Sequence, residues 1–330
     1  MDAGADIVLT GRVVDSALTL GPLMHEFGWS PDQFDLLSAG SLAGHLLECG
    51  PQSTGGLLTD WTATASWADP GFPLAIMQAD GTFEITCATG TDALVDHRSV
   101  AEQVLYEIGD PTAYLLPDVT CDWSGVELEE TGPNRVLVRG ARGRAPVPTL
   151  KACAQIPDGF RVAVQYFVGG RDAVAKAQRT ADDIVTRWRH LLAARGYGDF
   201  RAVTAYAVGS EQAYGAHARA TPSRESLVWV SAHHDDAAAL RLAVREFPSI
   251  GLAGAPGTGA LPAPAYRNRH QYFGSRRFRY RGNSFPRPSR STVPQSRSPT
   301  SHRPTARPSP HAVPISPAQV TYPLGDAPSP

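Results

Sequence analysis

The segment at residues 44–56, GHLLECGPQSTGG, places a histidine, a carboxylate and a thiol within five positions. If the segment is helical, Glu48 lies three residues and Cys49 four residues beyond His45, so the three side chains share one face. A general base beside a nucleophile has this composition, as does a borderline metal site. The alternative is a plain helix end, in which His45 and Glu48 contact solvent or a neighbouring strand and Cys49 packs as a small hydrophobic residue.

A turn rich in small residues follows the triplet. Gly50 and Pro51 end the predicted helix, and Thr54, Gly55 and Gly56 come next. Glycines let backbone amides approach an anion closely. We therefore expect this turn to contribute to the binding of an anionic ligand.

A second candidate site follows residues 5–10 (ADIVLT), a β-branched run that predicts a strand buried on both faces of a parallel sheet. Arg12, Asp15 and Ser16 come directly after it, and open α/β sheets bind their ligands at the carboxyl ends of such strands. Arg12 suits a phosphate or a carboxylate. The alternative is that Asp15 simply caps the helix behind it.

These segments together predict one pocket for an anionic ligand. In this pocket His45 or Asp15 is the general base and Cys49 is a possible nucleophile. The predicted catalytic residues are Asp15, His45, Glu48 and Cys49. The predicted ligand-binding residues are Arg12, Ser16, Thr54, Gly55 and Gly56.

The other motifs give weaker evidence for a functional site. Residues 233–236 (HHDD) suggest a metal cluster, but consecutive side chains diverge and Asp235 is a natural helix cap, so we assign no metal ligand. The loop 251–259 (GLAGAPGTG) lacks the Lys and Ser/Thr of a P-loop and the spacing of a dinucleotide fingerprint. The cysteines form no CxxC pair, which argues against a zinc knuckle or a redox dithiol and favours reduced thiols in a cytoplasmic protein. The motifs identify no cofactor.

The elements that must position these residues indicate the α/β class. The patterns predict a partial parallel or mixed sheet with helices, together with an antiparallel meander. Gly40 and Gly44 weaken the second helix and also permit close packing. The expected helices cover 15–27, 35–49, 99–108 (capped by Ser99, with Glu102 completing a capping box), 172–195 and 235–247; the strands cover 5–10, a hairpin at 72–87, the meander at 115–167, 202–209 and 226–233.

Composition divides the 330-residue chain near residue 260. Residues 261–330 contain eleven Arg, one Asp and half of the prolines, so their charge is about +10 and that of residues 1–260 about −12. We expect an α/β domain at 1–260 and a disordered tail at 261–330. The tail has no stacking platform, so we expect no specific nucleic-acid partner. No apolar run is long enough to span a membrane, and the first residues do not form a signal peptide.

Four stretches in order resemble the N-terminal domain of the acyclic terpene utilisation protein family (AtuA). They are ADIVLTGRVVDSALTLGPLMHEFGW, LAGHLLECGPQSTGG, VAEQVLYEIGDPTAYLLPDVTCDW and VLVRGARG, and the resemblance runs from about residue 3 to about residue 260. It implies an α/β domain in the bacterial catabolism of acyclic terpenes or branched acids as coenzyme A thioesters, with an undefined reaction. The implied partner is a small-molecule acid or acyl-CoA, and a homo-oligomer is possible.

Two departures from the family pattern bear on function. Members begin further upstream and continue as folded sequence after the GLAGAPGTG loop, so this chain resembles a product truncated at its N-terminus and altered after about residue 260. Three hypotheses follow. The chain is an enzyme or enzyme component, a non-catalytic binding or scaffold subunit of the same pathway, or an inactive truncated or frameshifted product.

Overall fold

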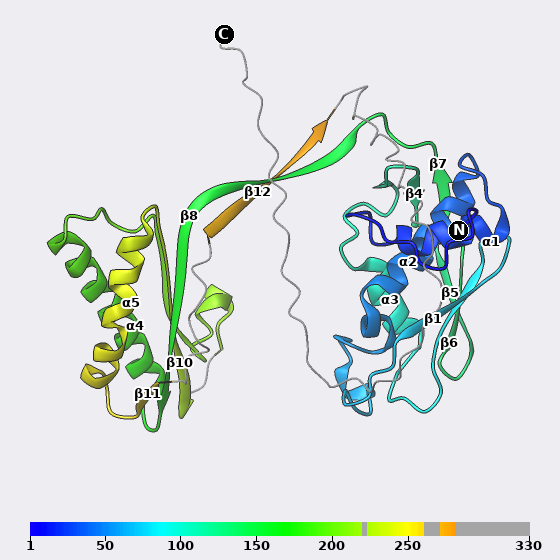
Figure 1. Cartoon of the computed structure of the whole chain (residues 1–330). Helices are drawn as coiled ribbons and strands as arrows, with labels where there is room; N and C mark the ends of the chain where they lie inside the picture. Colours follow the sequence, from blue (N-terminus) through cyan, green and yellow to red (C-terminus); the bar gives the residue numbers. More distant parts are fainter. Residues whose placement is uncertain (220–222, 261–270, 281–330) are drawn as a thin grey trace, which may run out of the picture. The chain divides into compact units, whose positions relative to one another are not determined.

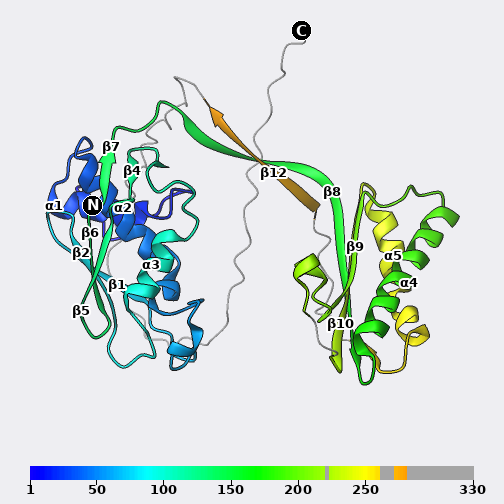
Figure 2. The ribbon, with the colours of Figure 1, turned by 180° about the vertical axis from the view of Figure 1, so that it is seen from behind.

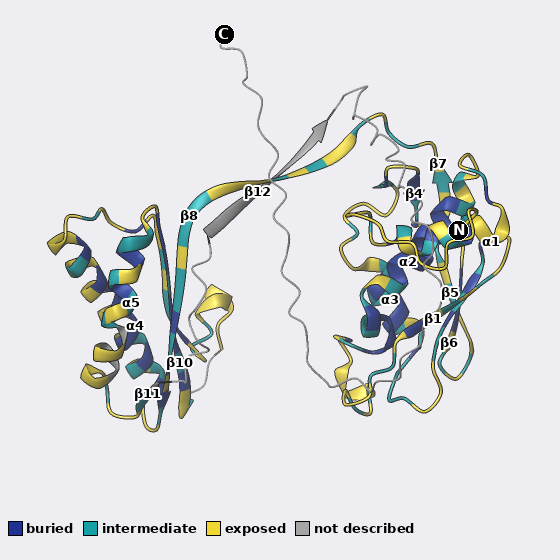
Figure 3. Cartoon of the chain, in the orientation of Figure 1, coloured by how far each residue is buried: buried dark blue, intermediate teal, exposed yellow. Residues whose placement is uncertain are grey.

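The computed structural model describes residues 1–219, 223–260 and 271–280. These residues contain two hydrophobic cores that share no member, one within residues 14–141 and the other within residues 160–244. We call residues 1–149 the first lobe and residues 150–260 the second lobe (Figure 1). Figure 3 shows buried residues concentrated where helices meet strands in each lobe.

Two helices of the first lobe pack against each other through glycine. α1 (Ala17–Phe27) ends at Gly28, which has a left-handed backbone, and α2 (Phe34–Glu48) ends next to Cys49. A Cβ atom added to Gly44 would lie 2.5 Å from the carbonyl oxygen of Ser16, so only glycine allows this approach. The predicted helices and the predicted packing role of Gly44 are confirmed.

The rest of the first lobe is built from short antiparallel strands around α2 and α3 (His97–Leu105). The predicted hairpin at 72–87 is confirmed, and Gly81 has a φ of 87° in its turn. One sheet has the order β1-β2-β6-β5 and a smaller one the order β3-β4-β7. The elements are η1 (Gly50–Thr54), η2 (Trp61–Ala63), β1 (Pro73–Met77), β2 (Phe83–Cys87), β3 (Tyr114–Leu115), β4 (Thr120–Asp122), β5 (Glu127–Gly132), β6 (Arg135–Arg139) and β7 (Arg142–Arg144).

The second lobe is one antiparallel sheet with two helices on one face. The sheet order β11-β8-β10-β9, with α4 after β8 and α5 after β10, is the split β-α-β arrangement of ferredoxin-like folds. Both helices cover the same face of the sheet, as Figures 1 and 2 show. The elements are β8 (Leu150–Gly169), α4 (Ala173–Ala194), β9 (Ala202–Val208), η3 (Gln212–His217), β10 (Glu225–His234), α5 (Ala237–Ala253) and β11 (Thr258–Ala260).

The expected parallel strand at residues 5–10 is wrong. This segment has no strand pairing, and Ile7 and Leu9 are 85% and 95% exposed. Every strand pairing among the described residues is antiparallel. A β-branched run favours extended backbone, but a strand forms only where neighbouring backbone groups pair with it. The α/β class itself is confirmed, with antiparallel sheets in place of the expected parallel or mixed sheet.

The expected disordered tail lies mostly outside the described residues. Within it, β12 (Gln271–Tyr280) is described and pairs with the first half of β8, from Leu150 to Phe160. The β12 backbone has hydrogen-bond partners along the β8 edge.

Candidate functional site

His45 lies at the centre of the candidate site, on the last turn of α2. Its side chain is 2% exposed. Nδ1 lies 3.0 Å from Oε1 of Glu48, and Nε2 lies 2.8 Å from the carbonyl oxygen of Gln103. A carbonyl oxygen only accepts hydrogen bonds, so Nε2 carries a hydrogen and donates it to Gln103. Nδ1 therefore shares a proton with the carboxyl group of Glu48, because two acceptor atoms 3.0 Å apart need one hydrogen between them.

Gln103 of α3 is a partner of His45 that no sequence motif indicates. Its side-chain nitrogen donates to the carbonyl oxygen of His45 at 2.9 Å, so the two residues are joined by reciprocal hydrogen bonds. Gln103 is fully buried, and its Oε1 has no hydrogen-bond partner among the described residues. The two residues are 58 positions apart, and no local pattern links them.

An aromatic pair covers the imidazole. The ring centroids of His45 and Trp123 are 5.5 Å apart, and those of Trp123 and Tyr114 are 4.9 Å apart. The indole nitrogen of Trp123 donates to Oγ of Ser38 at 3.1 Å, which fixes the orientation of the ring. His45 is therefore held by packing as well as by hydrogen bonds.

Carboxylates make the surroundings of this site electronegative. Burial raises the pKa of Tyr114, and the nearby charges of Glu48, Cys121, Glu107 and Asp15 raise it further. Glu107 is the largest cause of the raised pKa of Tyr106, followed by burial, Cys49 and Glu48. Both phenols therefore stay protonated at neutral pH and can donate hydrogen bonds.

Asp15 and Ser16 reach this cluster through the contact between Ser16 and Gly44. Ser16 is buried and is the first residue before α1, so Asp15 does not occupy the cap position considered for it. Asp15 is exposed, and its carboxylate makes no hydrogen bond with a described residue. The structure thus brings Asp15, His45, Glu48 and Cys49 to one end of α2. Arg12 is exposed and has no ion pair among the described residues.

The Thr54–Gly56 turn uses its polar groups internally. The amides of Gly55 and Gly56 both bond the carbonyl oxygen of Pro51, the latter at 2.8 Å. The Thr54 hydroxyl donates to the carbonyl oxygen of Gly71 at 2.7 Å. In this conformation the two amides are not available to an anion, and the turn serves to end η1.

The family model of the acyclic terpene utilisation family protein AtuA matches residues 1–276. The chain belongs to this family. The match continues past residue 260, where the resemblance was expected to stop. No curated protein and no solved structure matches the chain. Among the described residues of this AtuA family member, no helix is long and apolar enough to cross a membrane.

The HHDD motif of this AtuA family member has structural partners. Asp236, not Asp235, caps α5 by accepting from the amide of Ala238 at 2.7 Å, and it donates its own amide to Nδ1 of His234 at 2.8 Å. Asp235 forms an ion pair with Arg201 at 3.0 Å. The described part of the chain holds no group of three or more His, Cys, Asp and Glu side chains placed to bind a metal ion.

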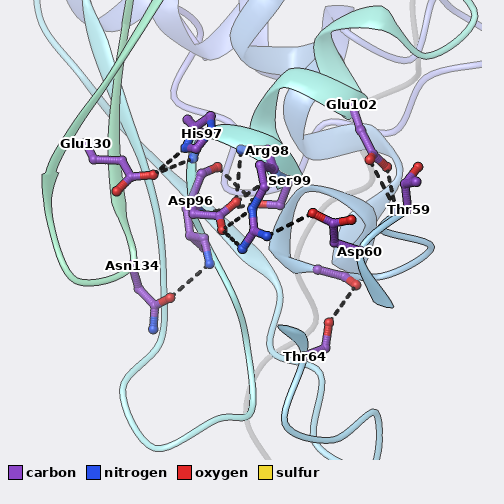
Figure 4. A network of polar contacts seen from close by, with 12 residues as sticks. Thr59, Asp60, Thr64, Asp96, His97, Arg98, Ser99, Glu102, Glu130 and Asn134 are labelled. Carbon is purple, nitrogen blue, oxygen red and sulfur yellow. Dashed lines mark hydrogen bonds and ion pairs between the residues drawn. The ribbon is translucent and has the colours of Figure 1, made fainter. Parts of the chain in front are cut away.

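A separate polar network fixes α3 and therefore Gln103 (Figure 4). Asp96, not Ser99, is the cap of α3, and it accepts from the amides of Arg98 and Ser99 at 2.9 and 3.0 Å. In return, the hydroxyl oxygen of Ser99 accepts a hydrogen bond from the amide of Asp96 at 3.1 Å. Glu102, the expected partner of Ser99, instead accepts from the amide of Thr59. The network thus ties α3 to the loop that follows η1.

We expect Asp96→Ala to lower the free energy of unfolding by about 1–2 kcal/mol, because two amides of α3 lose their acceptor. Burial alone would raise the pKa of Asp96, but hydrogen bonds from Arg98 and Ser99 outweigh it and hold the pKa below its usual value. The charged form therefore stabilises the fold above the unfolded-state pKa of about 4, and this contribution is lost as the pH falls through the lower folded-state pKa.

Urea unfolding of wild type and Asp96→Ala at pH 7 and pH 3 measures this difference. The gap between the two proteins should shrink at pH 3. Asp69→Ala is the control, because Asp69 is exposed and its side chain bonds no described residue. An equal gap at both pH values would contradict the assigned role of the carboxylate.

Proposed function

We propose that this AtuA family member acts in the bacterial breakdown of acyclic terpenes or branched acids, as an enzyme or enzyme component that transfers a proton on a coenzyme A thioester. Family membership supports the pathway. The observation that carries the proton-transfer role is the geometry of His45, whose Nε2–H is fixed by Gln103 while Nδ1 faces Glu48. An imidazole and a carboxyl group in this arrangement exchange a proton readily.

Each neighbouring group has a role in this proposal. Glu48 is the group that exchanges the proton with substrate, and His45 behind it supplies or receives that proton. The protonated phenols of Tyr106 and Tyr114 can donate hydrogen bonds to the uncharged thioester carbonyl oxygen. Glu107, beside them, has a φ of 60°, a left-handed conformation that non-glycine residues adopt rarely and that is often found at functional sites.

The charge of the site favours the thioester over the free acid. The carboxylates of Asp15, Glu48 and Glu107 would repel a carboxylate at the reacting position, whereas a thioester carbonyl is uncharged there. The proposal places the protein in the cytoplasm, in keeping with its unpaired cysteines. Among these thiols, Cys49 is half-buried at the site, while burial raises the pKa of Cys121 to about 12 and makes that thiol unreactive.

A second candidate function is a non-catalytic binding or scaffold subunit of the same pathway. One observation favours it: His45 is 2% exposed, and both ring nitrogens are bonded within the protein. This is the environment of a histidine that holds α2 against α3. The two functions differ in what an isosteric change at the neighbouring carboxylates should do.

We expect Glu48→Gln and Asp15→Asn each to abolish growth on an acyclic terpenoid, in a host that lacks its own copy of the protein, with melting temperatures within a few degrees of wild type. These changes remove the ionisable group and preserve its shape. His97→Gln is the matched control, because His97 forms the same kind of pair with Glu130 at 2.7 Å but is 64% exposed. Normal growth of both variants, or their unfolding, would favour the scaffold function.

A further inference from the structure

The second lobe contains a cavity of about 1070 Å³ at one end of its sheet. Its wall is formed by the connection from β8 to α4, the first turns of α4, the connection from β9 to the start of η3, and the residues just before β10. The lining residues are Arg171, Asp172, Val174, Ala175, Gln178, Gly209, Ser210, Gln212, Ser223 and Arg224. None of them belongs to the His45 site.

Two arginines stand on adjacent segments of this wall. The amide of Gly170 donates to the carbonyl oxygen of Arg224 at 2.8 Å, which places Arg171 and Arg224 on neighbouring stretches of backbone. Neither guanidinium has an ion pair or a hydrogen bond with any residue that the structure describes. By contrast, Arg189 and Arg201 of the same lobe pair with carboxylates at 3.1 and 2.9 Å.

The pairing of the arginines distinguishes this cavity from its neighbour. A cavity of about 670 Å³ between α4 and α5 also has basic residues in its wall. There, however, Arg187 pairs with Glu246 at 3.0 Å and Arg179 lies 3.7 Å from Asp183, so Lys176 is the one basic side chain of that lining without an ion pair to a described residue. In the larger cavity Asp172 is the single carboxylate of the lining against two unpaired guanidinium groups. A surplus of positive charge thus faces this cavity, in a body of the chain whose net charge is about −12.

We propose that this cavity binds a phosphate-bearing ligand, with Arg171 and Arg224 contacting the phosphate oxygens. Two like charges on adjacent segments repel each other, and a dianion relieves that repulsion. The planar, forked guanidinium donates paired hydrogen bonds to phosphate oxygens. The phosphate of a coenzyme A carrier and a free phosphate share this chemistry; the choice of coenzyme A as carrier rests on the proposed function.

Isothermal titration of the full chain with coenzyme A, pyrophosphate and inorganic phosphate tests the site. We expect coenzyme A and pyrophosphate to bind and to compete with each other. Arg171→Gln and Arg224→Gln should each weaken both ligands at least about tenfold, because each removes a charged hydrogen bond. Arg189→Gln, which changes a paired arginine of the same lobe, should leave the affinities unchanged.

The titration results test the phosphate site independently of the proton-transfer function proposed for the His45 site. Binding that is lost in both variants supports the site, and tighter binding of coenzyme A than of pyrophosphate also supports the thioester carrier. If pyrophosphate binds as tightly as coenzyme A, the site stands as a general phosphate site. Absence of binding, or binding unchanged in both variants, overturns it. Growth of the Glu48→Gln variant bears only on the His45 site.

Discussion

Replacing Gly44 with valine should separate the start of α1 from α2 and lower the free energy of unfolding by about 3 kcal/mol. The first added atom would already lie 2.5 Å from the carbonyl oxygen and 2.7 Å from the Cα atom of Ser16. These are backbone atoms, so no side-chain rotation relieves the overlap. Because Ser16 is next to Asp15, the same change should also move that carboxylate away from Tyr114, whose pKa it helps to raise.

Gly21→Ala is the matched control for this experiment. Gly21 lies within α1, and a Cβ atom added there meets nothing within 4 Å apart from its chain neighbours. Alanine at this position should change the free energy of unfolding by less than about 1 kcal/mol, because its helix propensity is offset by the contact of its Cβ atom with the ring of Pro22. Urea unfolding followed by far-UV circular dichroism measures both variants. If Gly44→Val unfolds at the same urea concentration as wild type, the tight contact between α1 and α2 is not present in solution.

Trp188→Ala should cost about 3–5 kcal/mol and is the most damaging single change that we expect in the second lobe. The Trp188 side chain is fully buried between α4 and the sheet, and its ring centroid lies 6.1 Å from that of Phe200. Its indole nitrogen has no hydrogen-bond partner among the described residues, so the loss comes from packing alone. Truncation leaves a cavity that the surrounding strands cannot fill.

Trp67→Ala controls for the removal of a tryptophan as such. Trp67 is 60% exposed and contacts the ring of Trp61 at a centroid distance of 6.1 Å. Its loss should change the free energy of unfolding by less than about 1 kcal/mol. Circular dichroism suits both variants because it does not depend on indole fluorescence. Similar midpoints for Trp188→Ala and wild type would contradict the assigned core position.

The spacing of apolar residues along the sequence predicts those helices and turns that depend on contacts between near neighbours in the chain. The helices around α1, α2 and α4 follow from apolar residues at helical spacing, and the β1–β2 hairpin follows from its Asp80-Gly81 turn. Residues 5–10 do not form the predicted strand because a strand depends on distant partners, which a short apolar run does not reveal. The sequence does not distinguish the cap of α3, because Asp96 and Ser99 each begin a plausible capping pattern.

The candidate site shows the same division between local and distant information. The i,i+3 spacing of His45 and Glu48 predicted a shared helix face, and the two side chains do meet at 3.0 Å. Gln103 lies 58 residues away, so only the fold reveals that it holds the imidazole. The glycine pattern at Gly55 and Gly56 suggested free amides, but the pattern does not show that the carbonyl of Pro51 already bonds them.

The separation of the two cores also determines how the chain loses structure. Because no side chain belongs to both, each lobe can open while the other keeps its buried surface, as in proteins whose hydrogen exchange proceeds through distinct cooperative units. The amides around His45 and those of the β8–β10 ladder should then exchange with different protection. Damage confined to the first lobe would disrupt the surroundings of His45 while leaving the two arginines of the second lobe in place.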